Sequence, residues 1–174
     1  IWIVHRNGII DKLDAATYRV VQRTSQMKHS TKGSIQNYTL FIDSDNELWM
    51  SVLLAGNPGG VFYYQPAGDR LSHFSKEKGD MRLNTNIVTG ITQDQEGIIW
   101  IGTDHGGVNL VNKKSKTVRY LLNDAEDHTT ISQNSIYSVY KDSSNIIWLG
   151  TYKQGICYYN NRMAMFSLFR HKVS

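Results

Sequence analysis

The sequence predicts an all-β fold, a β-propeller of four-stranded antiparallel blades that is present as a partial ring. Four tryptophans, Trp2, Trp49, Trp100 and Trp148, lie 47, 51 and 48 residues apart and fall at the same place in a repeated phrase. The phrase is a β-branched and aromatic run, a polar turn and a second apolar run, which is the pattern of two paired strands. A period of this size with one tryptophan per unit is typical of propellers and solenoids. Four strands per unit favour the propeller, because solenoid coils are usually shorter.

Each full unit begins with a strand that we expect to lie innermost in its blade, nearest the propeller axis. These strands are predicted at Tyr38–Ile42, Ile87–Gln93 and Ile136–Lys141. Each has a small residue ten positions before its tryptophan, which suits strands that converge near an axis. The small residues are Thr39, Gly90 and Ser138.

A tight turn is predicted between each inner strand and the tryptophan strand. An aspartate stands six residues before three of the tryptophans, and these are Asp43, Asp94 and Asp142. Three residues before the same tryptophans stand Asn46, Gly97 and Asn145. Glycine and asparagine tolerate the positive φ of tight hairpins. We expect each aspartate to accept hydrogen bonds from the backbone of its own turn.

Two further strands complete each unit. The third strands are predicted at Ile9–Leu13, Val61–Tyr64, Val108–Asn112 and Ile156–Asn160. The fourth strands are predicted at Tyr18–Gln22, Arg70–Phe74, Thr117–Leu122 and Met165–Phe169. Polar connectors separate the units at Arg23–Ile35, Ser75–Thr85 and Asn123–Gln133. No segment keeps a helical period, so almost no helix is expected.

The chain therefore reads as a single propeller segment, residues 1–174, of about three and three-quarter blades. The blades are predicted at approximately 1–24, which lacks its inner strand, and at 35–75, 86–122 and 134–170. A ring needs at least ~4 blades and usually more. This chain alone is not expected to close a ring of the usual size, and its free edge needs a partner.

Composition narrows the function classes. The 19 lysines and arginines exceed the 15 aspartates and glutamates only slightly and are spread along the chain, which argues against a nucleic-acid partner. The single cysteine, Cys157, excludes an internal disulfide and leaves the redox compartment open. No apolar run is long enough to span a membrane. The chain has no initiator methionine or signal peptide and starts inside a strand pattern, which suggests a piece of something longer.

No known catalytic constellation is present. The sequence has no nucleophile elbow, zinc-protease motif or phosphate loop, and its six histidines lack metal-ligand spacing, so we expect no catalytic residue, metal or cofactor. The four tryptophans are interpreted as structural residues of the blade core, because one large apolar side chain per blade suits packing between blades better than sugar stacking.

Candidate binding residues lie where the connectors and the turns between second and third strands emerge on one face. From those turns we select His5, Arg6, Asp104, His105, Tyr152 and Lys153. Asn86 and Asn134 stand fourteen residues before their tryptophans, and local capping and ligand contact are equal alternatives for both. Leu53–Pro58 is an insertion relative to the other blades, and insertions on one face often mark function.

The phrase from Asp94 through Gly97, Trp100-Ile101-Gly102-Thr103 and Gly107-Val108, led in by Asn86-Ile87-Val88, resembles the two-component regulator propeller repeat. The resemblance extends over four copies. It is strong in the third and fourth, which has Trp148-Leu149-Gly150-Thr151 and Gly155. It is weaker in the first two, where Val4-His5 and Ser51-Val52 replace Gly-Thr.

This resemblance implies an extracytoplasmic sensor region of a hybrid two-component system of the kind common in Bacteroidetes. Such a segment would lie in the periplasm as part of a membrane-anchored protein, sense an oligosaccharide, act within a dimeric receptor and leave phosphotransfer to histidine kinase and receiver domains outside this chain. Two alternatives remain open. One is a propeller scaffold for protein partners, and the other is a carbohydrate-active propeller enzyme, which would need paired carboxylates on the candidate face.

Overall fold

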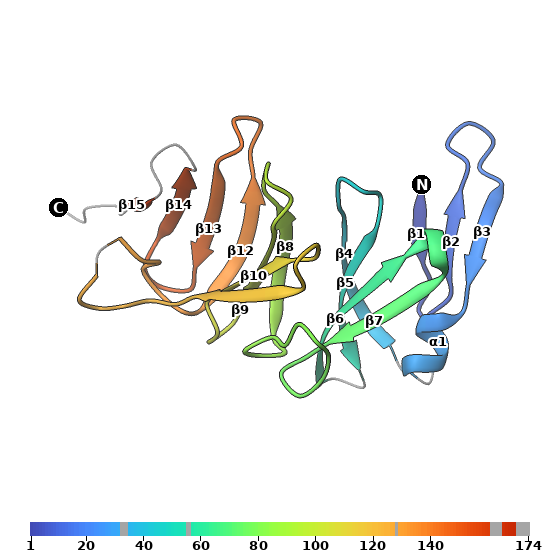
Figure 1. Cartoon of the computed structure of the whole chain (residues 1–174), viewed down its shortest axis with the longest axis horizontal. Helices are drawn as coiled ribbons and strands as arrows, with labels where there is room; N and C mark the ends of the chain where they lie inside the picture. Colours follow the sequence, from blue (N-terminus) through green and yellow to red (C-terminus); the bar gives the residue numbers. More distant parts are fainter. Residues whose placement is uncertain (32–34, 55–56, 128, 161–164, 170–174) are drawn as a thin grey trace.

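The computed structural model describes residues 1–31, 35–54, 57–127, 129–160 and 165–169. These residues form one three-stranded and three four-stranded antiparallel sheets. The sheets follow one another in chain order, with the N-terminal and C-terminal sheets at opposite ends of the row (Figure 1). The ring is open, so the predicted partial β-propeller is confirmed.

We number the sheets as blades 1 to 4. Blade 1 contains β1 (Trp2–Val4), β2 (Ile10–Leu13) and β3 (Val20–Thr24). Blade 2 contains β4 (Ile35–Ile42), β5 (Leu48–Leu54), β6 (Asn57–Gln65) and β7 (Arg70–Phe74). Blade 3 contains β8 (Val88–Gln93), β9 (Ile99–Thr103), β10 (Val108–Asn112) and β11 (Thr117–Leu121). Blade 4 contains β12 (Ile136–Lys141), β13 (Ile147–Thr151), β14 (Ile156–Asn160) and β15 (Met165–Phe169).

Three local features were not among the predicted elements. The connector after blade 1 contains a short helix, α1 (Gln26–Thr31), and a 3-10 turn, η1 (Pro66–Gly68), follows β6. The insertion at Leu53–Pro58 takes the form of an extension of the β5–β6 hairpin, because Leu53 pairs with Pro58 and Leu54 pairs with Asn57. Residues 55 and 56 at its tip, and the predicted end of the last blade at residue 170, lie outside the described residues.

The turn aspartates act as predicted, and they also hold the tryptophans. One Asp94 oxygen accepts hydrogen bonds from the backbone of Glu96 and Ile98 at 3.0 and 2.9 Å. Its other oxygen accepts the indole N–H of Trp100 at 2.8 Å. The same indole bond joins Trp49 to Asp43 at 3.0 Å and Trp148 to Asp142 at 2.8 Å. The turn residues Asn46, Gly97 and Asn145 have φ values of 60°, 84° and 63°, as expected for these hairpins.

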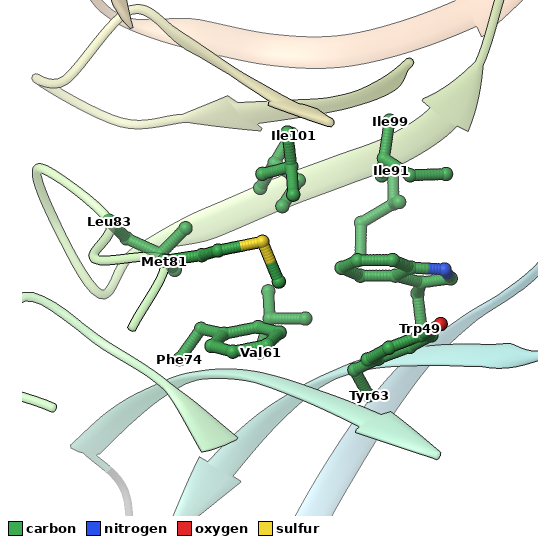
Figure 2. Close-up of a cluster of buried hydrophobic side chains, with 10 residues drawn as sticks. Trp49, Val61, Tyr63, Phe74, Met81, Leu83, Ile91, Ile99 and Ile101 are labelled. Atoms are coloured by element: carbon green, nitrogen blue, oxygen red, sulfur yellow. The ribbon is translucent and has the colours of Figure 1, made fainter. Parts of the chain in front are cut away.

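The tryptophans of blades 2 and 3 lie between blades. Trp49 is fully buried and stacks on Tyr63 of its own blade, with a ring-centroid distance of 4.2 Å. Across the interface it faces the isoleucines of blade 3, and Met81 and Leu83 of the connector close the cluster (Figure 2). Those isoleucines are Ile91, Ile99 and Ile101. Burial of such large apolar side chains is the main force that holds neighbouring blades together.

The other interfaces follow the same plan. Trp100 of blade 3 packs with Ile136, Ile147 and Leu149 of blade 4. Trp2 packs against the blade 2 cluster around Met50. Because blade 1 has no inner strand with a turn aspartate, the Trp2 indole donates instead to Asn46 Oδ1 of blade 2, at 3.3 Å. Trp49 and Trp100 are thus buried between blades, and Trp2 is partly buried against blade 2, while Trp148 of the last described blade is only partly buried.

A close approach of inner strands requires glycine in blade 3. A Cβ at Gly90 would lie 3.1 Å from the backbone nitrogen of Val139 on β12, and a side chain at Gly102 would meet Val139 and Ile136. The predicted small residue at this inner-strand position is thus needed where β8 meets β12. Blade 1 offers no inner strand among the described residues, and Leu40 and Ile42 of β4 are correspondingly exposed.

Candidate functional site

The candidate residues lie on what we call the connector rim, which comprises the connectors between blades and the turns between second and third strands. In Figure 1, α1 and the β7–β8 connector lie along the lower edge, opposite the β4–β5 and β12–β13 turns. Equivalent backbone bonds fix the turns to the starts of inner strands. Asp104 N–H donates to the carbonyl of Ile87 at 2.9 Å, and Tyr152 N–H donates to Ser135 at 3.0 Å.

The two rim asparagines are local caps, one of the alternatives left open by the sequence. Asn86 Oδ1 accepts the backbone N–H of Lys76, and Asn134 Oδ1 accepts that of Asn123, both at 2.7 Å. Their backbone carbonyls accept the N–H groups of Gly60 at 3.3 Å and Gly107 at 2.7 Å. Each asparagine therefore closes its connector onto the glycine turn of the preceding blade.

A cleft of about 280 Å³ lies between blades 2 and 3 on this rim. Its polar lining comes from Tyr38, Thr39, Ser51 and Asn86, and its apolar lining comes from Val52, Pro58, Ile87 and Val88. The volume is just below the range for small-molecule sites, which is ~300–1,000 Å³. Hydroxyl, amide and apolar groups together can hold a small polar ligand that also has an apolar face.

Tyr38 connects this cleft to blade 1. Its hydroxyl donates a hydrogen bond to the backbone carbonyl of His5. Burial raises the pKa of Tyr38, and the positive charge of Arg6 opposes that shift only in part. Tyr38 therefore stays a neutral donor, and it brings the His5–Arg6 turn to the edge of the cleft.

His5 and Arg23 are exposed side chains that both contact the buried carboxylate of Asp11 in blade 1. Its Nε2 lies 2.9 Å from Asp11 Oδ2, and Arg23 forms a two-pronged pair with Asp11 at 2.7 and 2.8 Å. The hydrogen bond from Arg23 lowers the pKa of Asp11 to about 2, although burial opposes that shift. His5 is thus oriented by Asp11, which the sequence analysis did not select.

Asp104 and His105 contact each other on the turn of blade 3. Asp104 Oδ1 lies 3.0 Å from His105 Nδ1, and the His105 side chain is largely exposed. His105 has a φ of 64°, so this turn uses the left-handed region at a non-glycine residue. The hydrogen bond from the Asp104 backbone N–H to the Ile87 carbonyl is what links this turn to the wall of the cleft.

Blade 4 carries a separate group. Tyr152 stacks on Tyr137 with a centroid distance of 5.9 Å, and Lys153 Nζ lies 5.2 Å from the Tyr152 ring centroid. Lys153 N–H donates to Gln133 Oε1 at 3.0 Å. Tyr137 was not among the residues predicted from the sequence. A β-bulge between Ile136 and Ser138 changes the alternation of side chains along β12 at this position.

A second missed cluster lies away from the rim, where Lys113 of blade 3 reaches three carboxylates of blade 2. Its Nζ lies 2.6 Å from Asp43 and Glu47 and 2.7 Å from Asp45. Burial opposes the ammonium charge, but the hydrogen bonds that Lys113 donates to the carboxylates outweigh it and raise the pKa of Lys113. These carboxylates are close enough to ligate a metal ion, but the lysine occupies their centre.

The structure thus groups the candidates by interface. Asn86 lines the cleft between blades 2 and 3, and the His5 carbonyl accepts a hydrogen bond from the cleft residue Tyr38. Asp104 is bonded through its backbone to Ile87 of the cleft wall. Asn134, Tyr152 and Lys153 lie at the blade 4 end of the rim. The cleft residue Tyr38 was assigned from the sequence to an inner strand and not to a site.

One protein family matches this chain, in the two blades whose sequences show the repeat most clearly. The two component regulator propeller family matches residues 82–105 and 130–153. The chain carries two-component regulator propeller repeats. The matched repeats cover the inner and tryptophan strands of blades 3 and 4, where the sequence resemblance is strong. No curated protein matches this chain.

Solved structures with the same fold include an extracellular domain of a two component system, a secretion component and an enzyme. The extracellular domain of the hybrid two component system BT3049 from B. thetaiotaomicron is 21% identical, with a TM-score of 0.64, over 98% of this chain and 21% of that one. PorZ, a type-IX secretion system component of Porphyromonas gingivalis, is 12% identical, with a TM-score of 0.66, over 99% and 27%. Virginiamycin B lyase from Staphylococcus aureus is 13% identical, with a TM-score of 0.60, over 99% and 55%.

The chain spans about a fifth of the extracellular domains that it matches. In the part of the chain that the structure describes, no helix has the length and apolar character needed to cross a bilayer. These solved structures, an enzyme among them, share the propeller fold with this chain.

Proposed function

We propose that this chain is an extracytoplasmic sensor segment of a hybrid two-component signalling protein and that it binds an oligosaccharide at the connector rim. The cleft between blades 2 and 3 is the observation that carries the proposal. The cleft lies between β4 of blade 2 and the start of β8 in blade 3. Its lining combines a tyrosine hydroxyl, small hydroxyl side chains and an apolar wall.

The chemistry of the cleft suits a sugar. A pyranose offers hydroxyl groups around its edge and apolar C–H faces, so it needs both polar partners and an apolar surface. Tyr38, Thr39 and Ser51 offer hydroxyl groups, while Val52 and Ile87 offer apolar surface. The stacked Tyr137–Tyr152 pair on blade 4 is a further exposed aromatic surface that an extended saccharide could contact.

Binding between blades also offers a route to signalling. A ligand in contact with both blades favours one relative arrangement of them over another, and only such differential affinity can shift a conformational equilibrium. The shift would pass through a dimeric receptor in the periplasm to a membrane-anchored histidine kinase, whose domains lie outside this chain. Phosphotransfer residues are not required of this segment.

Calorimetric titration of the 174-residue chain with neutral and acidic oligosaccharides from plant cell walls and host glycans tests the proposal. Ile87 lies on the cleft wall and is partly exposed, so Ile87→Glu should leave the fold intact. We expect micromolar binding that Ile87→Glu weakens at least about tenfold, equivalent to about 1.4 kcal/mol. Val21→Glu, an exposed position on blade 1 that does not line the cleft, is the control.

Three results would count against the proposal. The absence of a binding signal with every oligosaccharide would favour a scaffold for protein partners. Binding that both variants retain would place the ligand elsewhere, and the appearance of shorter sugars during the titration would indicate an enzyme.

A further inference from the structure

A second cleft lies between blades 3 and 4. Its volume is about 400 Å³, which is larger than that of the cleft between blades 2 and 3 and lies within the range of small-molecule sites, ~300–1,000 Å³. We call it the blade 3–4 cleft. It reaches the outermost strand of blade 3, since the residues from Arg119 to Leu122 line it, and Ile131 and Tyr159 line it on the side of blade 4. Two adjacent blades of the row therefore form its walls, and the uncovered ends of the row do not.

Blade 3 departs from its neighbours beside the tryptophan. In blades 2 to 4 the tryptophan pairs across the sheet with a residue of the third strand, and paired residues point to the same side of a sheet. That residue is a tyrosine in blades 2 and 4 and a leucine in blade 3, namely Tyr63, Tyr158 and Leu110. The next residue of the row, on the fourth strand, is Ser72 in blade 2 and Arg119 in blade 3. Blade 3 thus has a smaller apolar residue and a longer cationic residue in this row.

The leucine leaves space that a tyrosine ring fills in the other two blades. Those rings lie against their own tryptophans, with centroid distances of 4.2 Å in blade 2 (Figure 2) and 5.4 Å in blade 4. Leu110 has no ring to cover Trp100 in this way, and Tyr159 approaches that indole from blade 4, at 5.1 Å. The corresponding groove between blades 2 and 3, where Tyr63 is present, has a volume of only about 280 Å³.

The lining of the blade 3–4 cleft is mostly apolar or aromatic, and its two threonine hydroxyls already donate to Asp127. Asp94 is likewise occupied by the backbone of its own turn and by the Trp100 indole. Arg119 is exposed, and no residue in the described part of the chain forms an ion pair or a hydrogen bond with its guanidinium. Within the described lining, the cleft therefore offers an apolar wall and an unpaired guanidinium.

Charge is distributed unevenly along this cleft. Asp94 and Glu96 lie in the turn before the tryptophan strand, whereas Arg119 lies two strands further out in the sheet. Neighbouring strands are about 4.8 Å apart, so the backbones of β9 and β11 are separated by ~10 Å. An anion is therefore attracted to the Arg119 end of the cleft and repelled from the turn end.

We infer that the blade 3–4 cleft binds a small carboxylate that has an aromatic or branched aliphatic body. The Arg119 guanidinium pairs with the carboxylate, because its donors match the two oxygens. The body lies in the space beside Leu110, where removal of its apolar surface from water stabilises the complex. Asp94 and Glu96 fix the orientation of the ligand, since they repel the carboxylate from the other end. This site shares no residue with the sugar cleft and does not depend on the proposed function.

Amide NMR of the isotope-labelled 174-residue chain tests the inference with 3-phenylpropionate and 3-phenylpropionamide as probes. The two probes share the ring and the chain and differ in charge. We expect 3-phenylpropionate to bind with a Kd below about 1 mM and to shift the backbone N–H signals of Leu110, Leu121 and Ile131. The neutral probe should bind at least about tenfold more weakly, because it forms no charged pair with Arg119.

Two variants separate the contribution of the charge from that of the space. Arg119→Gln should lower the affinity for 3-phenylpropionate to that for the neutral probe. Leu110→Tyr introduces the tyrosine of blades 2 and 4, so it should remove the binding of both probes. The controls are Arg19→Gln, at an exposed arginine of blade 1, and Ile87→Glu, in the cleft between blades 2 and 3, and both should bind the probes like the wild type. Circular dichroism checks that every variant keeps its β content.

Four results would overturn the inference. The first is the absence of any shift with 3-phenylpropionate, and the second is equal affinity of the wild type for both probes. The third is a preference for the carboxylate that Arg119→Gln retains. The fourth is a set of shifts confined to residues outside the blade 3–4 cleft.

Discussion

Each turn aspartate uses its two carboxylate oxygens for two different tasks. In blade 3, one oxygen of Asp94 closes the hairpin through backbone N–H groups and the other accepts the Trp100 indole N–H. The sequence predicted the first task from the Asp-x-x-Gly pattern. The second follows from the fixed spacing of six residues between aspartate and tryptophan, which places both side chains on the same edge of the hairpin.

Removal of this carboxylate should destabilise blade 3. We expect Asp94→Ala to lower the free energy of unfolding by about 2 kcal/mol, because the backbone donors and a buried indole lose their acceptor together. Urea denaturation measures the change. Asp124→Ala is the control, because Asp124 accepts one backbone bond from Glu126 in an exposed turn. Equal losses for both variants would contradict the dual role.

From the contacts of Asp11, a single residue, we predict how the free energy of unfolding depends on pH. Its hydrogen bond from Arg23 lowers the carboxyl pKa from 3.8 to about 2, so the unfolded chain takes up this proton first as the pH falls. The stabilisation is complete above about pH 4 and is lost between there and about pH 2. The difference in unfolding free energy between the wild type and Asp11→Asn should therefore shrink across that window. Urea denaturation at a series of pH values measures it, and a constant difference would refute the assignment.

At the scale of elements, Lys113 joins two blades. The turn after β10 carries its ammonium into the carboxylates of the β4–β5 turn, and its side chain is mostly buried. We expect Lys113→Met to destabilise the chain by about 3 kcal/mol, because removal of one partner leaves buried negative charge uncompensated. Thermal and urea denaturation measure the loss. Lys114→Met, at the adjacent exposed lysine, should change stability by less than about 0.5 kcal/mol. A similar loss from both lysines would contradict a specific inter-blade bond.

Elements were predictable to different degrees from the sequence. The tryptophan strands and their turns follow from local chemistry, so β9 and β13 lie where Trp100 and Trp148 predict them. The extended β5–β6 hairpin was missed, because Leu53–Pro58 was compared with the shorter turns of other blades. Tyr137 lies at a bulge that alters the strand period, and Lys113 was missed because its partners are 66 to 70 residues away in sequence.

At the scale of the molecule, stability and function both arise between blades. Each tryptophan interface adds a nearest-neighbour contribution, as in other repeat proteins, so the row can be open at both ends and still have a continuous core. The candidate cleft also lies between blades, where neither blade alone supplies the full lining. Its members Tyr38 and Ser51 lie on blade 2 and Asn86 precedes blade 3, which explains why patterns within one repeat unit did not reveal it.

Amide NMR of the isotope-labelled chain during saccharide titration tests the central claim most directly, because it locates the ligand without a mutation. A saccharide that binds in calorimetry should shift the amides of Thr39, Ser51 and Val88 in the cleft, with little change at the β11 amides on the outer edge of blade 3. Shifts confined to residues away from the cleft, or no shift with any saccharide of the panel, would contradict a sugar-sensing site between blades 2 and 3.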